Sequence, residues 1–141
     1  MPLIENSDAI RKLLESTKRI AVLGIKTEDD YAPAYYVPEY AQKAGYEIIP
    51  VPVYFREVTE ILGQRVYRRL VDIPGDIDMV NVFRRPKDIP PHVDDILAKR
   101  PRSVWMQLGI SHDEVAKRLV DEGIDVVQDR CLLVELRRIG R

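Results

Sequence analysis

The sequence predicts an α/β fold: a single doubly wound domain with a mostly parallel five-stranded sheet and helices on both faces. Short apolar runs alternate with amphipathic helical stretches along the 141 residues. Two of these runs end at Gly24 and Gly109, and each is followed by a helical stretch, a second glycine and a further apolar run. This is the pattern of βαβ units, whose right-handed crossovers give a parallel sheet covered by helices. We therefore expect a Rossmann-like domain.

The expected elements follow from apolar spacing and from helix start and stop signals. Strands are predicted at 20–23, 46–51, 77–83, 103–108 and 124–127. An N-terminal helix within 1–17, capped by Ser7, should pack on the domain, which we expect to span 1–141. Further helices are predicted at 33–44, from the pair Pro90 and Pro91, and from a capping box formed by Ser111 and Glu114. Residues 66–71 fit either a short helix or a strand.

Composition excludes several functional classes. The chain is 45% hydrophobic and 32% charged, which is typical of a folded, soluble protein. Its net charge of -1 gives no general attraction for nucleic acid. No apolar run is long enough for a membrane helix, and the first residues do not resemble a secretory signal. The single cysteine, Cys131, forms no internal disulfide, and we expect a cytoplasmic protein without a metal site.

A doubly wound sheet binds ligands beyond the carboxyl ends of its strands, where the strand order reverses. This rule selects the loops after Gly24, Val51 and Phe83. Gly24 would let the backbone approach a phosphate, but a simple turn would also require a glycine there. The dinucleotide fingerprint G-x-G-x-x-G is absent, since Lys26 and Asp29 occupy its other glycine positions.

The second-strand tip also argues against a nicotinamide cofactor. An Asp or Glu that binds the ribose is expected there, whereas this chain has Pro50, Val51, Pro52 and Val53, with no carboxylate before Glu57. Such an apolar tip suits a flat base, although the prolines alone would also end the strand.

Cations gather in the same predicted loops. Arg84, Arg85 and Lys87 follow the third strand, and Arg56 follows the second. They fit either phosphate binding or a solvated basic turn, and their position at the predicted crevice favours phosphate binding. His92 and His112 lack a catalytic or metal-binding pattern, and Cys131 fits a packed thiol.

Six segments, in order and at their spacings, resemble small stand-alone CoA-binding domain proteins, which are similar to the amino-terminal domain of the succinyl-CoA synthetase α subunit. They are IAVLG at 20–24, AGYEIIPV at 44–51, VDIP at 71–74, VNVFRRP at 80–86, VWMQLGI at 104–110 and DRCLLVE at 129–135.

The resemblance implies that coenzyme A lies along the crevice. Gly24, Ile25, Lys26 and the helix start at Pro33 and Ala34 would meet the phosphates. Arg56 should face the same crevice because of its predicted position in the loop after the second strand. Pro50, Val51, Pro52 and Val53 would flank the adenosine, and Phe83, Arg84 and Arg85 the pyrophosphate and pantetheine arm. Gln107 and Gly109 would lie beside that arm.

Two stretches depart from the family pattern. The usual Ser-Arg-Pro step is Tyr31-Ala32-Pro33, so an arginine is missing, and the usual Val-Asn-Pro is Val51-Pro52-Val53. The first loop also contains Glu28, Asp29 and Asp30 in a row. Coulomb repulsion predicts that these acids oppose a phosphate unless they turn outward.

The expected function is the binding of coenzyme A or an acyl-CoA by a non-catalytic module, either regulatory or carrier-type. No nucleophile with a base and an orienting group can be assembled from the sequence, so no catalytic residue is assigned. Two alternatives stay open: an interaction module with a degenerate nucleotide crevice, and an enzyme that uses a nicotinamide nucleotide. Neither nucleic acid nor a membrane is expected as a partner, while a homo-oligomer and an unknown protein partner both stay open.

Overall fold

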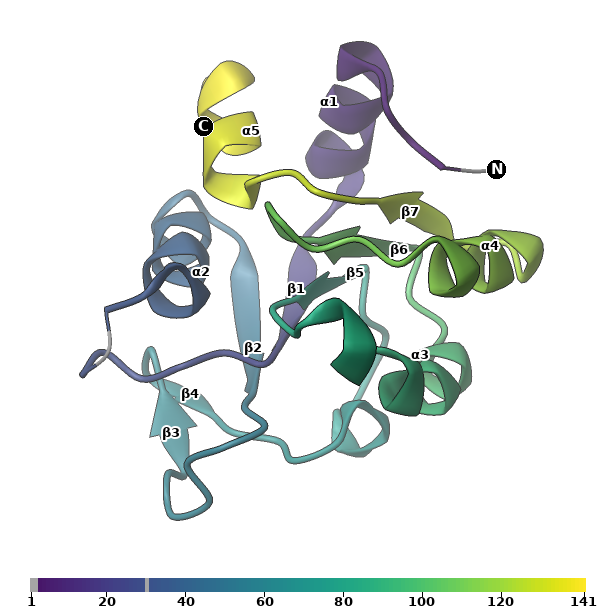
Figure 1. The fold of residues 1–141 in the computed structure, drawn as a ribbon. Coiled ribbons are helices and arrows are strands. Elements are labelled where there is room, and N and C mark those ends of the chain that lie inside the picture. The colour runs from purple at the N-terminus through teal and green to yellow at the C-terminus, as the bar shows by residue number, and fades with distance from the viewer. Residues whose placement is uncertain (1–2, 30) are drawn as a thin grey trace.

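The computed structural model describes residues 3–29 and 31–141, and its centre is a five-stranded sheet (Figure 1). All neighbouring strands of this sheet pair in parallel, in the order β2-β1-β5-β6-β7. The strands are β1 (Arg19–Leu23), β2 (Glu47–Val51), β5 (Met79–Val82), β6 (Ser103–Met106) and β7 (Asp125–Val127). The predicted five-stranded parallel sheet is thus confirmed.

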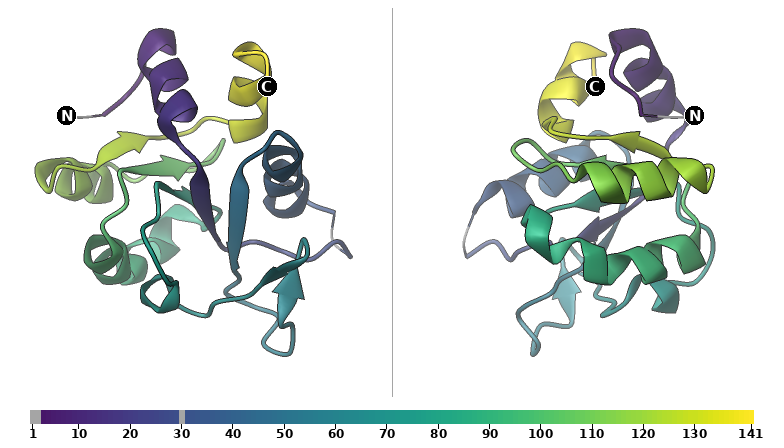
Figure 2. Two further views of the ribbon diagram at one scale, coloured as in Figure 1. Left: turned by 180° about the vertical axis from the view of Figure 1, so that it is seen from behind. Right: turned by 45° about the vertical axis from the view of Figure 1, so that its right-hand side comes forward.

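Helices cover both faces of the sheet, as the sequence predicts (Figure 2). They are α1 (Ser7–Ser16), α2 (Pro33–Lys43), α3 (Val93–Lys99), α4 (Asp113–Asp121) and α5 (Leu132–Arg138). One core cluster joins α3 and α4 to one face through side chains such as Ile96 and Leu119. The other joins α1, α2 and α5 to the opposite face through Leu14, Val37 and Leu136. Burial of both faces explains why the strands are almost continuously apolar.

The strand order reverses between β1 and β5, because the chain passes from β1 to β2 on one side and later returns to β5 on the other. Backbone hydrogen bonds join the ends of the three strands at this point. The amide of Gly24 donates to the carbonyl of Val51 at 2.9 Å, and the amide of Phe83 donates to that of Leu23 at 2.8 Å. The ends of β1, β2 and β5 therefore form the reversal point at which such sheets bind ligands.

Between β2 and β5 the chain forms small elements that the apolar pattern does not reveal. A hairpin of β3 (Glu60–Ile61) and β4 (Gln64–Arg65) turns at Leu62 and Gly63, both with positive φ. The 3₁₀ helix η1 (Leu70–Asp72) follows. Two-residue strands are too short to show periodicity, so only the turn at Gly63 could be predicted.

Two predicted helix caps are wrong by one residue. Asn6, rather than Ser7, caps α1, because its Oδ1 accepts from the amide of Ala9 at 2.9 Å. His112, rather than Ser111, precedes α4, and its Nδ1 accepts from the amide of Val115 at 3.2 Å. In both cases the side chain that reaches the free amide three residues ahead becomes the cap.

The prolines after β5 begin 3₁₀ turns, including Pro90, where the sequence predicts the start of an α-helix. These are η2 (Pro86–Asp88) and η3 (Pro90–His92), and α3 begins directly after the second. A proline is tolerated in the first turn of a helix, as Pro33 is at the start of α2, so Pro90 and Pro91 still mark the start of the helical segment that continues as α3. None of the described helices has the length and apolar character needed to cross a membrane.

Candidate functional site

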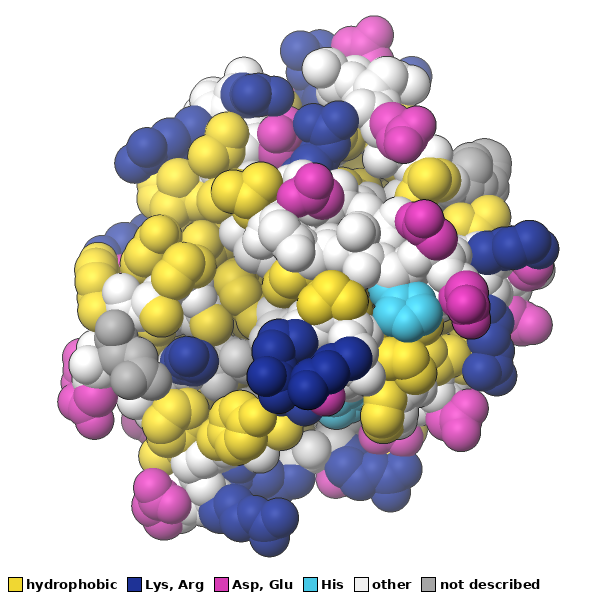
Figure 3. Space-filling model, in the orientation of Figure 1, with side chains coloured by type: hydrophobic (Ala, Val, Ile, Leu, Met, Phe, Trp, Pro, Cys, Tyr) yellow, Lys and Arg dark blue, Asp and Glu magenta, His cyan; other side chains and the backbone are white. Residues whose placement is uncertain are grey.

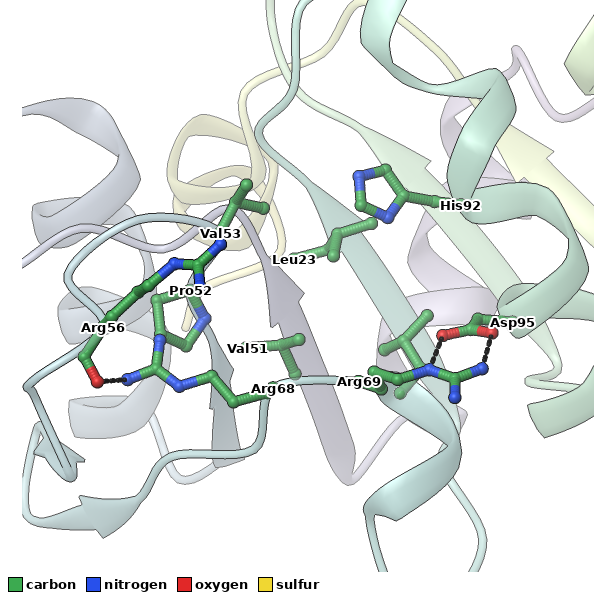
Figure 4. Close-up of a pocket in the computed structure, with 10 residues that line it drawn as sticks. Leu23, Val51, Pro52, Val53, Arg56, Arg68, Arg69, His92 and Asp95 are labelled. Atoms are coloured by element: carbon green, nitrogen blue, oxygen red, sulfur yellow. Dashed lines mark hydrogen bonds and ion pairs between the residues drawn. The ribbon is translucent and has the colours of Figure 1, made fainter.

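A cleft of about 530 Å³ opens beyond the ends of β1 and β2, beside the reversal point (Figure 4). We call it the cationic cleft. Its walls come from the β2 tip, the segment before η1 and the start of α3. Its lining residues are Leu23, Val51, Pro52, Val53, Arg56, Arg68, Arg69, Leu70, His92 and Asp95. Apolar side chains from two strands thus lie beside three arginines, an arrangement that suits a ligand with both a flat base and phosphates.

Arg68 holds the loop that follows β2. Its guanidinium donates to the carbonyls of Tyr54, Phe55, Arg56 and Val58, at distances from 2.7 to 3.3 Å. Phe55 has a φ of 61°, an unfavourable backbone conformation for a bulky residue. The four hydrogen bonds stabilise this conformation and so fix the position from which Arg56 extends.

Arg69 is paired across the cleft with Asp95 of α3. Its Nη2 and Nε donate to the two carboxylate oxygens at 2.8 and 3.1 Å (Figure 4). The hydrogen bonds from Arg69 lower the pKa of the Asp95 carboxyl below its usual value. This bidentate pair therefore places a compensated carboxylate, rather than an isolated negative charge, in the cleft.

The Arg56 side chain is exposed, and its guanidinium is available to bind a ligand. Figure 4 shows its side chain extending along Pro52 and Val53 at the β2 tip. Among the described residues, no side-chain hydrogen bond or ion pair engages its guanidinium, whereas Arg68 and Arg69 are committed to protein acceptors. Arg56 is thus the lining arginine that can bind an anion without giving up an internal contact.

Arg84 supplies a second cation at the reversal point. Its side chain is only 15% exposed, and its guanidinium lies 3.9 Å from Asp88 and 5.7 Å from the centre of the Tyr54 ring. Its Nε is buried without a hydrogen-bond partner among the described residues. A buried donor without a partner is costly, so a ligand oxygen that accepted from it would be stabilising.

Gly24 lies against the segment that carries Arg84. It has a φ of +89°, and a Cβ there would overlap the carbonyl oxygen of Phe83 and lie 3.3 Å from Cδ of Arg84. Only glycine permits this backbone conformation and this close approach together. The glycine of the first loop is therefore required by packing against the neighbouring strand end.

His92 points into the cleft from the residue before α3 (Figure 4). Burial lowers the pKa of its imidazole, and the nearby charge of Arg84 lowers this pKa further, against the smaller opposing effects of Asp95 and Asp88. The neutral ring is accordingly favoured near pH 7, where it offers one donor and one acceptor.

A separate cleft of about 400 Å³ lies between the β1–α2 loop and the β3–β4 hairpin. We call it the acidic cleft, because Glu28, Asp29 and Glu60 are among its lining residues. None of these three lines the cationic cleft. Asp30, the third acid of the triplet, lies outside the described residues.

A family model described as a CoA binding domain matches residues 18–137. The chain belongs to the CoA binding domain family. The protein YneT of Bacillus subtilis (strain 168) is 36% identical over 125 residues, which cover 89% of this chain and 90% of YneT. The family resemblance predicted from the six sequence segments is confirmed.

Solved structures show the same fold. A protein of Thermus thermophilus is 40% identical, with a TM-score of 0.88 over 96% of this chain and 99% of that one. A hypothetical protein of Pyrococcus horikoshii OT3 is 28% identical, with a TM-score of 0.87 over 99% of this chain and 96% of that one.

In this member of the CoA binding domain family, the structure brings part of the predicted site together. Val51, Pro52, Val53 and Arg56 line the cationic cleft. Gly24, Phe83 and Arg84 meet at the reversal point beside it. Figure 3 shows lysine and arginine side chains grouped near the middle of this face, over the segment that follows β5, with hydrophobic surface around them.

The other predicted residues of this family member lie apart from the lining of the cationic cleft. Ile25 is buried in the core on the α2 side, next to Lys26, whose amide donates to the carbonyl of Ala34 at 3.1 Å. Pro33 begins α2, and the Pro50 carbonyl accepts from Tyr67 at 3.0 Å.

Three further predicted residues are engaged by protein groups. Arg85 is 70% exposed, and its Nε lies 3.1 Å from a carboxylate oxygen of Asp88. Gln107 is buried, and its Oε1 accepts from the amide of Leu132 at 3.3 Å. Gly109 donates its amide to Asp129 at 2.6 Å.

Sequence reasoning missed Leu23, Arg68, Arg69, Leu70, His92 and Asp95 as lining residues of the cleft. Arg68 and Arg69 lie in the stretch 66–71, for which the sequence fits either a short helix or a strand. Only the fold brings them beside the β2 tip. A signal did exist for His92, because Pro90 and Pro91 place it at a helix start just after the basic segment at 84–87.

Proposed function

We propose that the protein binds coenzyme A or an acyl-CoA in the cationic cleft and at the adjoining reversal point, without chemically changing it. One observation carries this proposal. Two cations that are not tied up in strong internal ion pairs, Arg56 and Arg84, flank an apolar strand tip and a glycine turn. Membership of the CoA binding domain family supports the same ligand.

The proposed arrangement assigns each part of the ligand to a matching surface. The adenine would lie on the apolar tip formed by Val51, Pro52 and Val53. The diphosphate would lie near Gly24 and Arg84 at the reversal point, where the buried Nε of Arg84 lacks a partner among the described residues. The pantetheine arm would continue past Phe83 toward Gln107 and Gly109.

The chemistry of the lining supports binding rather than turnover. No serine, threonine or cysteine side chain is among the described lining residues of the cationic cleft. Asp95 is held by Arg69, and His92 has no adjoining nucleophile in the described lining. The cleft thus offers donors and apolar surface for holding a ligand. The same features suit a carrier or regulatory role.

Thermal unfolding with increasing coenzyme A tests the proposal. A ligand at a hundredfold excess over its Kd stabilises the folded state by about 2.7 kcal/mol, so Tm should rise by several degrees. The variant Arg84→Gln should weaken binding about tenfold or more, because it removes a charge-assisted contact. Millimolar coenzyme A without any effect on Tm would contradict the proposal.

Arg102→Gln provides a matched control. Arg102 is exposed and precedes β6, so it lies at the amino-terminal edge of the parallel sheet, opposite the cleft. The variant removes the same charge and should keep the wild-type response. Mass spectrometry after incubation with acetyl-CoA should recover the ligand intact; its conversion to products would contradict a purely binding role.

A further inference from the structure

We infer that the cationic cleft recognises a phosphate monoester on the ribose of its ligand, and that Arg56 is the residue that binds this group. The inference rests on the proposed function, since in coenzyme A the group is the 3′-phosphate. It adds a specificity: the protein should distinguish coenzyme A from dephospho-CoA, which lacks only that phosphate.

The tip of the second strand faces the ribose in doubly wound nucleotide-binding sheets. A carboxylate at this tip binds an unmodified ribose diol, whereas an arginine there accommodates a ribose phosphate. Here β2 ends at Val51 and is followed by Pro52 and Val53, and the charged residue that extends over this tip is Arg56 (Figure 4).

The remaining charges of the cleft leave this role to Arg56. Arg68 directs its guanidinium to four backbone carbonyls, and Arg69 forms a bidentate pair with Asp95. Asp95 is also the one carboxylate among the described lining residues, and Arg69 compensates its charge. An incoming phosphate monoester therefore meets one available guanidinium and no uncompensated carboxylate in the described lining.

The backbone around Arg56 is fixed before any ligand arrives. The carbonyl of Arg56 itself accepts from Arg68 at 3.0 Å, and those of Phe55 and Val58 accept at 2.9 and 2.7 Å. Because the loop is already ordered, only the Arg56 side chain has to be ordered within the protein when a phosphate binds, which lowers the conformational entropy cost of recognition.

Arg84 is suited to a different phosphate. It lies against Gly24 at the reversal point and is mostly buried, whereas Arg56 is exposed at the β2 tip. Two cations on different elements thus match a ligand with two separate phosphate groups, a diphosphate and a monoester. An NAD-type ligand with a free ribose diol would leave Arg56 without a partner.

A thermodynamic cycle tests the inference. Coenzyme A and dephospho-CoA are titrated by calorimetry into the wild type, into Arg56→Gln and into the control Arg102→Gln. The wild type and the control should bind coenzyme A about ten- to a hundredfold more tightly than dephospho-CoA, the range of a charge-assisted hydrogen bond. Arg56→Gln should lose most of this preference and bind dephospho-CoA as the wild type does.

The outcomes separate the inference from the proposed function. If neither ligand binds the wild type, the proposed function fails. If both bind equally well, only the phosphate recognition fails. A preference that persists in Arg56→Gln overturns the assignment to Arg56, and so does a variant that weakens both ligands equally.

Two fragments identify the source of the ribose phosphate. Adenosine 3′,5′-bisphosphate corresponds to coenzyme A, and adenosine 2′,5′-bisphosphate to NADP. The first should bind more tightly to the wild type, and this advantage should depend on Arg56. Tighter binding of the 2′-isomer would overturn the assignment to a 3′-phosphate.

Discussion

The cationic cleft and the acidic cleft are neighbours with opposite charge. Arg56 lines the first, and Val58 and Glu60, only a few residues further along the chain, line the second together with Glu28 and Asp29. The segment after β2 therefore contributes to both clefts and separates them. The fold thus sorts charges that are close in the sequence into separate surfaces.

This separation bears on the repulsion that the sequence predicts. Glu28 and Asp29 follow Gly24 by only a few residues, so the linear order suggests acids beside a phosphate site. In the structure both line the acidic cleft, which the hairpin closes on its other side. Charges that face solvent are screened by water and salt, and their effect on a ligand in the other cleft is correspondingly small.

The largest effect is expected from a glycine beside the cationic cleft. Gly24→Ala should lower the free energy of unfolding by about 2–5 kcal/mol, because it adds backbone strain at positive φ to an overlap with the Phe83 carbonyl. Urea unfolding monitored by circular dichroism measures this loss.

A glycine of the acidic cleft gives the matched control. Gly63 also has a positive φ, of +72°, but a Cβ there would meet nothing within 4 Å. Gly63→Ala should therefore cost only the backbone strain, about 1–2 kcal/mol. Equal losses in the two variants would show that the close approach at Gly24 is not what requires glycine.

A smaller effect is expected from pH. Burial and the charge of Arg84 lower the pKa of His92 in the folded state, so near pH 6 the unfolded chain binds more protons at this residue than the folded chain does. The free energy of unfolding should consequently decrease as pH falls below about 6.5. His92→Gln should reduce this slope in urea titrations across that range.

Arg84→Gln isolates one cause of this pH dependence, because it removes the neighbouring charge while keeping the imidazole. The pKa of His92, followed by its ring proton resonance, should rise in this variant. An unchanged pKa would show that the charge of Arg84 does not reach the cationic cleft.

The smallest effect is expected on the acidic side. Glu28→Gln and Asp29→Asn should each change the Kd for coenzyme A by about twofold at most, as is usual for exposed surface charges. Arg56→Gln in the other cleft should have a clearly larger effect. A tenfold gain in affinity on neutralising either acid would show that the two clefts are electrostatically coupled.

The sequence predicted the fold well because its strongest signals are local. Apolar runs and helical stretches end at Gly24, Gly45, Gly109 and Gly123, and all four glycines have positive φ. Short elements carry no comparable signal: the β3–β4 hairpin has too few residues for a pattern, and the helix caps depend on which side chain reaches an amide.

The candidate site likewise combines features that the local sequence predicts with features that only the fold decides. Consecutive residues were enough to predict the parallel sheet, the apolar tip at 51–53 and the family, because strand periodicity and ordered motifs are local properties of the chain. Which charges are available became clear only from the folded arrangement. Arg68 and Arg69 are occupied by carbonyls and by Asp95, Arg56 is free among the described residues, and Glu28 and Asp29 line another cleft. Such pairing depends on distances between residues that are far apart in the chain, and folding sets those distances.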